Sequence, residues 1–238
     1  MQAEIITIGD ELLIGQVVDT NSAWLGRTLG EDGIKVTQST SIQDDADQIS
    51  RTVNEALARV SIVLVTGGLG PTRDDITKHT LAELFGMRLV RDEQVYETVR
   101  RQLAVRGIAF NELNRGQALV PDGCTVLPNR NGTAPGMWFE RGGKILVSMP
   151  GVPFEMKALV TDEVLPRLRT HFSLHANVHR TATTFGLAES ILAERIAPWE
   201  AALPANLRLA YLPSALCIRL RLSAYETDPE KARSEIGP

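Results

Sequence analysis

The sequence predicts an α/β fold, a mostly parallel sheet covered by helices on both faces, followed by a small, incomplete α+β domain. Two observations lead to this prediction. Strand-like and helix-like segments alternate through the first half of the chain, which is the pattern of a parallel sheet. The strand-like segments are also continuous apolar runs, as expected for strands that are buried on both faces. We place the α/β domain at residues 1–170 and the small domain at residues 177–238.

Two kinds of hydrophobic pattern define the first elements. Ala3–Ile8 is a short β-branched run that ends at Gly9, which is typical of a buried strand. Ala46–Ala58 instead carries apolar residues at the spacing of one helix face. The same reasoning predicts, in order, a strand at Ala3–Ile8, a helix at Asn21–Glu31, a strand at Ile34–Ser41, a helix at Ala46–Ala58 and a strand at Ser61–Thr66.

Shorter elements complete both domains. The α/β domain is predicted to continue with helices at Ile76–Phe85, Asp92–Ala104, Glu112–Ala118 and Phe154–Leu168 and with strands at Thr125–Leu127, Met137–Glu140 and Lys144–Ser148. We interpret His171–Ala176 as a linker. The small domain is predicted as a βαββ unit made of Asn177–Phe185, Leu187–Ile196, Leu207–Leu212 and Leu216–Ala224. A well-capped helix begins at Asp228 and stops within about eleven residues, so we expect this domain to be truncated.

Composition and charge exclude several classes of protein. With 29 acidic and 25 basic side chains the net charge is −4, so the chain lacks the basic stripe of a nucleic-acid-binding protein. Its apolar runs are far shorter than the roughly 18 residues of a membrane span, and Asp10 and Glu11 come too early for a secretory signal. Two cysteines, Cys124 and Cys217, make a disulfide framework implausible. We expect a cytoplasmic protein.

Three polar or glycine-rich loops follow predicted strands, where ligands bind in open α/β sheets. They are Gly9-Asp10-Glu11, the loop from Thr66 to Thr77, and Pro150-Gly151-Val152-Pro153. In the second loop, three glycines can expose backbone N–H groups to an anion, and Asp74 and Asp75 can hold a divalent ion against phosphates. The alternative interpretation is a tight turn with an aspartate cap and no ligand.

Other chemical signatures are absent or weak. The chain has no P-loop, no Gly-x-Gly-x-x-Gly at a helix start, no nucleophile elbow and no Arg-Glu-x-x-Glu-Glu helix. His171, His175 and His179 are spaced by four, but we favour a solvated linker over a metal site, and a surface position for His79. Trp24 and Phe154 can border a nucleobase, although core packing is the favoured interpretation for both.

Four ordered motifs resemble those of the CinA family (competence/damage-inducible protein A). They cover residues 3–168 and continue weakly into Gly186-Leu187-Ala188-Glu189-Ser190. The motifs are Gly9-Asp10-Glu11-Leu12-Leu13-x-Gly15 with Asp19-Thr20-Asn21, the loop from Thr66 to Thr77, Gly132-Thr133-Ala134-Pro135-Gly136, and Pro150-Gly151-Val152-Pro153-x-Glu155-Met156.

The resemblance implies a three-layer domain similar to the molybdopterin-binding MoaB/MogA fold. It implies hydrolysis of ADP-ribose to AMP and ribose 5-phosphate, with a divalent metal (Mg²⁺, Mn²⁺ or Co²⁺) and potassium, in a homodimer. Asp44 and Asp75 match aspartates of the molybdopterin relatives, and Asp10 matches less closely. Full-length members often add a domain that removes the amide of nicotinamide mononucleotide, and we expect this polypeptide to lack that activity. The small domain resembles a KH-like spacer without a Gly-x-x-Gly clamp, so RNA binding is not expected.

Our hypothesis is therefore metal-assisted hydrolysis of a pyrophosphate. Asp10, Asp44 and Asp75 would hold metal, and Glu11 or Asp74 would orient water. Arg73 balances charge or is simply solvated. The substrate would lie against Gly67, Gly68, Gly70, Thr72, Gly132, Thr133, Ala134, Pro150 and Gly151. Two alternatives stay open, a pterin-binding or adenylyl-transfer protein of the molybdopterin pathway and a non-catalytic nucleotide-binding module.

Overall fold

The computed structural model describes residues 1–72, 74–172, 178–224 and 236. The chain divides into two compact units by its internal contacts. The larger unit consists of Met1–Thr28 and Lys35–Phe172, and the remaining residues form the smaller unit. In the described part of the chain, no helix is both long and apolar enough to cross a membrane.

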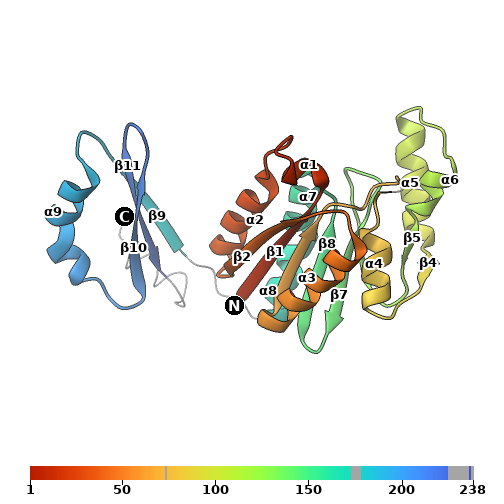
Figure 1. Cartoon of the computed structure of the whole chain (residues 1–238), viewed down its shortest axis with the longest axis horizontal. Helices are drawn as coiled ribbons and strands as arrows, with labels where there is room; N and C mark the ends of the chain where they lie inside the picture. The colour runs from red at the N-terminus through yellow and green to blue at the C-terminus, as the bar shows by residue number, and fades with distance from the viewer. Residues whose placement is uncertain (73, 173–177, 225–235, 237–238) are drawn as a thin grey trace. The chain divides into compact units, whose positions relative to one another are not determined.

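A six-stranded sheet forms the centre of the larger unit (Figure 1). Its order is β2 (Lys35–Ile42), β1 (Gln2–Ile8), β3 (Ile62–Thr66), β8 (Lys144–Met149), β7 (Gly136–Arg141) and β6 (Thr125–Leu127). The first four neighbours are parallel, the fifth strand is antiparallel to the fourth, and the sixth is antiparallel to the fifth. The sheet is mixed and mostly parallel, which confirms the predicted α/β fold class.

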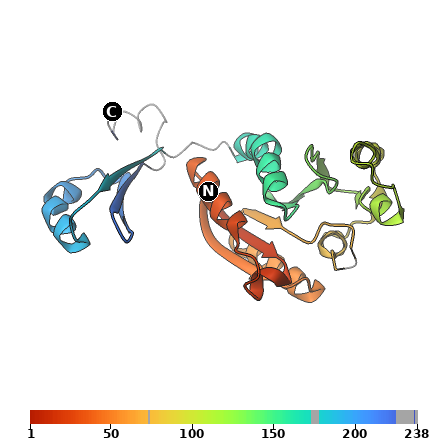
Figure 2. The same ribbon diagram turned by 90° about the horizontal axis from the view of Figure 1, so that it is seen from above.

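Helices lie on both sides of this sheet, as the view from above shows (Figure 2). The chain moves from β1 to one neighbour, β2, and then to the other neighbour, β3. Right-handed crossovers in opposite directions place their helices on opposite faces. The helices of the unit include α2 (Thr20–Glu31), α3 (Ala46–Arg59), α4 (Thr77–Leu84), α7 (Pro153–Leu159), a π-helical turn (Val160–Val164) and α8 (Leu165–Phe172). The π turn interrupts the single helix that was expected from Phe154 to Leu168.

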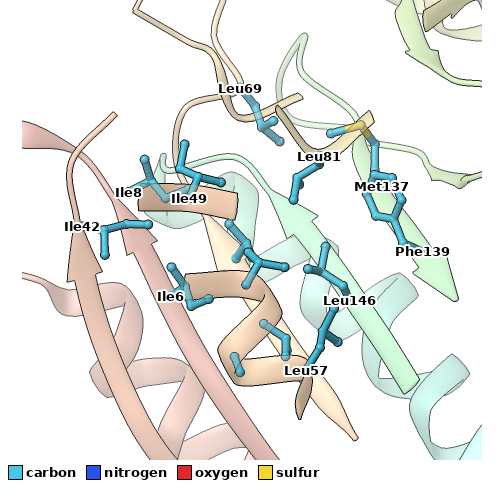
Figure 3. Packing of buried hydrophobic residues seen from close by; sticks show 14 of the residues in the cluster. Ile6, Ile8, Ile42, Ile49, Leu57, Leu69, Leu81, Met137, Phe139 and Leu146 are labelled. Atoms are coloured by element: carbon cyan, nitrogen blue, oxygen red, sulfur yellow. The ribbon is translucent and has the colours of Figure 1, made fainter. Parts of the chain in front are cut away.

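The core beneath α3 explains why this helix forms where the periodicity predicted it (Figure 3). Asp45 caps the helix by accepting a hydrogen bond from the Gln48 amide, 2.8 Å away. Alternate residues of β1, such as Ile6 and Ile8, point to the same face of the sheet. The four apolar residues of the helix that pack into this cluster are Ile49, Val53, Ala56 and Leu57.

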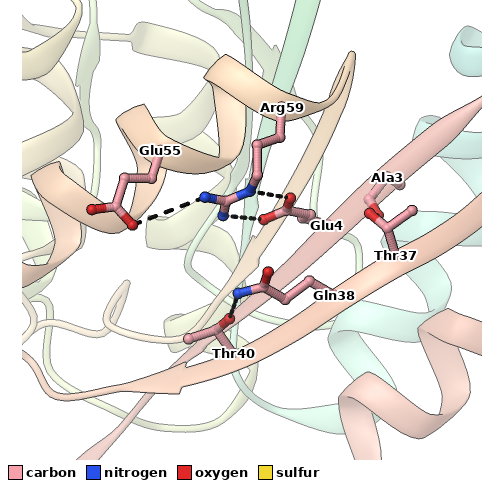
Figure 4. A network of polar contacts seen from close by, with 7 residues as sticks. All are labelled: Ala3, Glu4, Thr37, Gln38, Thr40, Glu55 and Arg59. Atoms are coloured by element: carbon pink, nitrogen blue, oxygen red, sulfur yellow. Dashed lines mark hydrogen bonds and ion pairs between the residues drawn. The ribbon is translucent and has the colours of Figure 1, made fainter.

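One ion pair joins the end of α3 to the centre of β1 (Figure 4). Glu4 is only 3% exposed, in a strand that is buried after its first residue. Arg59 Nε and a terminal nitrogen each donate to one Glu4 oxygen at 2.8 Å. Because a buried carboxylate is costly without a partner, this bidentate pair fixes how the last turn of α3 lies on the sheet.

A lateral arm with its own small core extends from the larger unit (Figure 1). Two short strands, β4 (Leu89–Arg91) and β5 (Leu119–Pro121), pair antiparallel. They enclose α5 (Glu93–Val105) and α6 (Glu112–Gly116) in sequence. Neither strand was predicted, because a run of three residues gives only a weak strand signal. The core of the arm contains Val95, Val99, Leu103, Ala118 and Val120.

The smaller unit has the predicted βαββ order. It contains β9 (Val178–Thr184), α9 (Glu189–Ala201), β10 (Leu207–Pro213) and β11 (Ile218–Ala224), with β11 between the other two strands in an antiparallel sheet. The linker prediction was wrong at His171, which lies in the last turn of α8. The rest of that linker up to residue 172 is also helical, residues 173–177 lie outside the described residues, and so does the helix expected at Asp228.

Candidate functional site

A cleft of about 510 Å³ lies at the carboxyl ends of β1, β3 and β8. All three loops that the sequence singled out contribute to it. It brings together eleven of the fourteen predicted site residues, and Asp10, Thr72 and Gly132 do not line it directly. The eleven are Glu11, Asp44, Asp74, Asp75, Gly67, Gly68, Gly70, Thr133, Ala134, Pro150 and Gly151.

The glycine loop after β3 has the backbone shape that only glycine adopts easily. Gly67 and Gly68 have φ of 115° and 63°, in the left-handed region. A side chain at Gly67 would also overlap the Ile8 carbonyl, and one at Gly68 would overlap Thr77 Oγ1. The loop therefore packs directly against the ends of β1 and α4. Within the described residues, the amides of Gly67 and Gly70 already donate to protein acceptors, which leaves those of Gly68 and Leu69 for a ligand.

Asp75 organises the second half of this loop. Its carboxylate accepts from the Gly70 amide at 2.7 Å, from the Thr72 amide at 2.9 Å and from the Thr72 hydroxyl at 2.5 Å. Gly70 has no side chain, and a Cβ there would overlap this carboxylate. Asp75 is thus a loop anchor as well as a negative charge in the cleft. Arg73, between these residues, lies outside the described part of the chain.

Asp44 is the acidic residue at the end of β2, and its surroundings disfavour its charge. Burial raises its pKa, and the nearby charges of Asp10, Glu11, Asp75 and Asp74 raise it further, from an ordinary value of 3.8 to about 6. Such a concentration of carboxylates attracts a cation. No group of three or more His, Cys, Asp or Glu side chains among the described residues is arranged to hold a metal alone.

Asp10 and Glu11 lie on a short helix, α1 (Asp10–Leu13), rather than in the loop that was expected. Four residues are too few to show helical periodicity, so this turn could not be predicted. Glu11 folds back over Gly9, which leaves no room for a side chain there. Asp10 is exposed and reaches the cleft only through its charge.

Glu155 lines the cleft although the sequence analysis did not select it as a site residue, and Asn129 holds it in place. Asn129 is 5% exposed and donates from Nδ2 to the Ala134 carbonyl at 2.9 Å and to Glu155 Oε2 at 2.7 Å. Its Oδ1 accepts from the Gly132 amide at 3.0 Å. A side chain at Gly132 would overlap the Glu155 carboxylate. Glu155 belongs to the motif that begins at Pro150, but no sequence pattern indicates that Asn129 donates a hydrogen bond to it.

Asn21 and Thr66 fasten the third loop to the sheet. Asn21 Nδ2 donates to the Gly151 carbonyl at 2.7 Å, and the buried Thr66 hydroxyl donates to the Pro150 carbonyl at 2.8 Å. Gly151 in turn lies against Gly67, with 3.4 Å from its ideal Cβ position to Gly67 Cα. The second and third loops are therefore in direct contact.

Gln117 lines the cleft from the end of α6, and Lys78 contacts the residue before it. Lys78 Nζ donates to the Gly116 carbonyl at 2.9 Å. Burial lowers the pKa of Lys78 to about 8, although the charge of Asp75 opposes this effect. Gln117 is 4% exposed and lines the cleft, and its Oε1 has no hydrogen-bond partner among the described residues.

The remaining candidates lie elsewhere. His79 is exposed, as predicted, and His179 on β9 lies 2.8 Å from the Ser223 hydroxyl. Phe154 is 59% exposed, so the expectation of core packing was wrong for it, because it occupies the first turn of α7 on the solvent side. Trp24 is half-buried, with Lys157 Nζ 5.8 Å from its ring.

Two family models match the sequence. One is described as a probable molybdopterin binding domain and matches residues 4–170. The other is described as the damage-inducible protein CinA KH domain and matches residues 179–238.

Two curated relatives are similar over nearly the whole chain. A CinA-like protein of Cytophaga hutchinsonii is 48% identical over 234 residues, which are 98% of this chain and 56% of the relative. A CinA-like protein of Flavobacterium psychrophilum is 46% identical over 238 residues, 100% of this chain and 57% of the relative. The chain spans a little more than half the length of these relatives.

Solved structures share the fold of the larger unit. The CinA protein of Thermoplasma acidophilum, described as having unknown function, matches with a TM-score of 0.62 and 36% identity over 67% of this chain and 94% of that chain. The molybdopterin biosynthesis enzyme MoaB of Thermus thermophilus matches with a TM-score of 0.50 and 20% identity over 72% of this chain and 94% of that chain. The second likeness is one of fold alone.

Proposed function

Because the chain belongs to the family of CinA-like proteins, we propose that its cleft hydrolyses the pyrophosphate bond of ADP-ribose, giving AMP and ribose 5-phosphate. One observation carries the proposal. Three loops with the glycines and carboxylates expected of a pyrophosphate site meet in one cleft at the carboxyl ends of parallel strands.

The donor set of the cleft fits a divalent cation. Carboxylate oxygens are ligands that Mg²⁺ and similar ions prefer, and the pKa of Asp44 is raised first by burial and then by the neighbouring carboxylates. Since no three described side chains are arranged to hold an ion by themselves, Asp44 and Asp75 would hold it together with substrate phosphate and water oxygens, with Asp10 adding charge. When bound, the ion would neutralise charge that develops on the pyrophosphate.

The protein itself supplies positioning. The amides of Gly68 and Leu69 face no described acceptor and can donate to phosphate oxygens. Asp75 keeps that loop in shape through Gly70 and Thr72. Glu11 and Asp74 line the same cleft and can orient a water molecule for attack on phosphorus.

Release of AMP from ADP-ribose by the purified chain tests this proposal, with Mg²⁺, Mn²⁺ and Co²⁺ each assayed with and without K⁺. We expect Asp75→Ala to lower turnover by about a hundredfold or more. Because Asp75 also anchors its loop, Asp75→Asn is assayed as well: it removes the charge and keeps one acceptor oxygen, while its Nδ2 replaces the oxygen that accepts from either Gly70 or Thr72.

Asp47→Ala is the matched control, because Asp47 is exposed in the first turn of α3. Its turnover should equal that of the unaltered chain. A near-normal rate for folded Asp75→Ala would contradict the assignment of Asp75. Tight binding of ADP-ribose without AMP release under every metal would favour a binding module, and binding of molybdopterin in place of ADP-ribose would favour a pterin protein.

A further inference from the structure

Gln117 is a buried polar side chain whose acceptor is left without a partner at the edge of the cleft. It is 4% exposed, its Oε1 is enclosed, and no described residue donates to that oxygen. The side chain nevertheless lines the cleft. Buried polar groups are nearly always hydrogen-bonded, so an orphan at a cleft points to a ligand or an ordered water as its partner.

The backbone at Gln117 is fixed by contacts with neighbouring helices. It follows α6 directly, and the Gly116 carbonyl beside it accepts a hydrogen bond from Lys78 Nζ at 2.9 Å. Lys78 belongs to α4, the helix that leaves the glycine loop. The backbone next to Gln117 is therefore hydrogen-bonded to the helix that follows the glycine loop.

Glu155 provides a second acceptor in the same cleft. Asn129 Nδ2 holds its Oε2 at 2.7 Å, and the missing side chain of Gly132 makes room for the carboxylate. Among the described residues, no lysine or arginine forms an ion pair with Glu155. The carboxylate is thus oriented by a neutral donor, and its other oxygen is left for a ligand.

This pair of groups selects a particular ligand chemistry. A carboxylate only accepts hydrogen bonds and repels phosphate, whereas an amide both donates and accepts. A hydroxyl group satisfies both, since it can donate to Glu155 and accept from the side-chain N–H of Gln117. Acidic residues bind ribose hydroxyls in the same way in dinucleotide sites.

We propose that Glu155 and Gln117 form a subsite for the sugar hydroxyls of a nucleoside diphosphate sugar, in the same cleft as the loop that would take its phosphates. The inference rests on the proposed function, because it assumes that a pyrophosphate linked to a sugar occupies the cleft. It makes both residues determinants of specificity for the sugar, and it assigns them no part in breaking the pyrophosphate bond.

The test compares Glu155→Gln and Gln117→Leu with a matched control, Glu140→Gln, which changes an exposed residue of β7. Binding is measured by calorimetry and hydrolysis by kcat/KM, each for four ligands. The first is ADP-ribose itself. Two ligands lack sugar hydroxyls: the methyl ester of ADP has no distal ribose, and the 2′-deoxyadenosine analogue of ADP-ribose lacks one hydroxyl of the adenosine ribose. The fourth is the analogue of ADP-ribose with hypoxanthine in place of adenine, which lacks the base amino group.

We expect the unaltered chain to prefer ADP-ribose over one of the two hydroxyl-deficient ligands by about tenfold or more. The deficient ligand that loses affinity identifies which ribose is read. Either variant should remove this preference by lowering the affinity for ADP-ribose and leaving the affinity for the hydroxyl-deficient ligand unchanged. This is the result that a double-mutant cycle gives when the side chain and the hydroxyl interact directly. Circular dichroism verifies that each variant folds. Gln117→Leu removes a buried polar atom that has no hydrogen-bond partner among the described residues, so we expect this variant to fold. It provides the test if Glu155→Gln does not fold.

An equal loss of affinity for all four ligands in both variants would overturn the subsite. A loss of affinity that depends on the amino group of the base, and not on a sugar hydroxyl, would overturn it too. A chain that binds all four ligands equally would overturn it as well. Sugar-dependent binding without AMP release would overturn the proposed hydrolysis and support the subsite. Failure of the unaltered chain to bind any of the ligands would overturn both.

Discussion

The Asp44 carboxylate lies half-buried at the end of β2, in a cleft that contains other carboxylates. Burial and then the charges of Asp10, Glu11, Asp75 and Asp74 raise its pKa from 3.8 to about 6. At neutral pH the folded chain therefore carries a charge that the unfolded chain would solvate better. A cation would remove this penalty, so function and stability oppose each other at this residue.

We expect Asp44→Asn to stabilise the metal-free protein at pH 7 by about 1 kcal/mol, after discounting for solvent screening. Below pH 3.8 the Asp44 carboxyl is protonated in both states and carries no penalty. Between pH 3.8 and about 6 the unfolded chain releases the proton first, so the folded state loses relative stability. The gain from Asp44→Asn should therefore grow over this window and stay constant above it. Urea unfolding at four pH values measures it.

The same variant should lower ADP-ribose hydrolysis by about a hundredfold, since an amide is a poor ligand for a divalent ion. Asp47→Asn, a nearby exposed aspartate, controls for a general change of charge and should alter neither quantity. Loss of stability at pH 7 on Asp44→Asn would show that the charge of Asp44 is favourable in the fold, against this account.

Single residues that follow a strand could be predicted as site residues, because the carboxyl ends of parallel strands meet at one edge. Asp44, Asp75 and Gly67 are of this kind. Asn129 and Gln117 could not, because their roles depend on contacts with residues distant in the sequence, such as Glu155 at 26 positions. Nothing in the local pattern distinguishes these two amides from solvated ones.

At the scale of an element, the glycine loop joins β3 to α4 with almost no space to spare. Gly68 has φ of 63°, and a Cβ on it would lie 3.0 Å from Asp44 Oδ1 and would overlap Thr77 Oγ1. Gly86, just after α4, has φ of 68° but has nothing within 4 Å of the same position. The two glycines share a backbone conformation and differ in their surroundings.

Gly86→Ala should therefore cost only the strain of the left-handed backbone, about 1 kcal/mol in the free energy of unfolding. Gly68→Ala should cost more than Gly86→Ala by at least about another 1 kcal/mol, because Thr77 and Asp44 must move. It should also lower hydrolysis by about tenfold or more, whereas Gly86→Ala should not change it. Chemical denaturation and the AMP assay give both numbers. Equal stability losses for the two variants would show that the loop can relax.

Elements with a long repeating pattern were predicted to within a few residues, whereas of the three-residue strands only β6 was predicted. The periodicity of α3 and the apolar run of β3 are set by the buried faces that they form. By contrast, α1, β4 and β5 have four, three and three residues. They exist because tertiary contacts hold them, for example the hydrogen bond that the Arg88 amide donates to Asp122 at 3.1 Å beside the β4–β5 pair.

At the scale of the whole molecule, the two units have separate cores and separate family matches. Residues 4–170 match the molybdopterin-binding model, and residues 179–238 match the CinA KH model. Every residue that lines the cleft belongs to the larger unit. We therefore expect the proposed chemistry to depend on residues of the larger unit.

A chain that ends after residue 172 should therefore keep ADP-ribose hydrolysis with kcat/KM within about threefold of the 238-residue chain. The physical reason is that the cleft, its glycine loop and the Asn129–Glu155 contact all lie within these residues. Folding is checked first by circular dichroism, and a retained response to Asp75→Asn shows that the same site is active. A folded short chain that binds ADP-ribose but does not release AMP would mean that the βαββ unit supplies a group to the reaction. Hydrolysis at the normal rate would instead limit that unit to roles outside the chemistry, such as spacing or association.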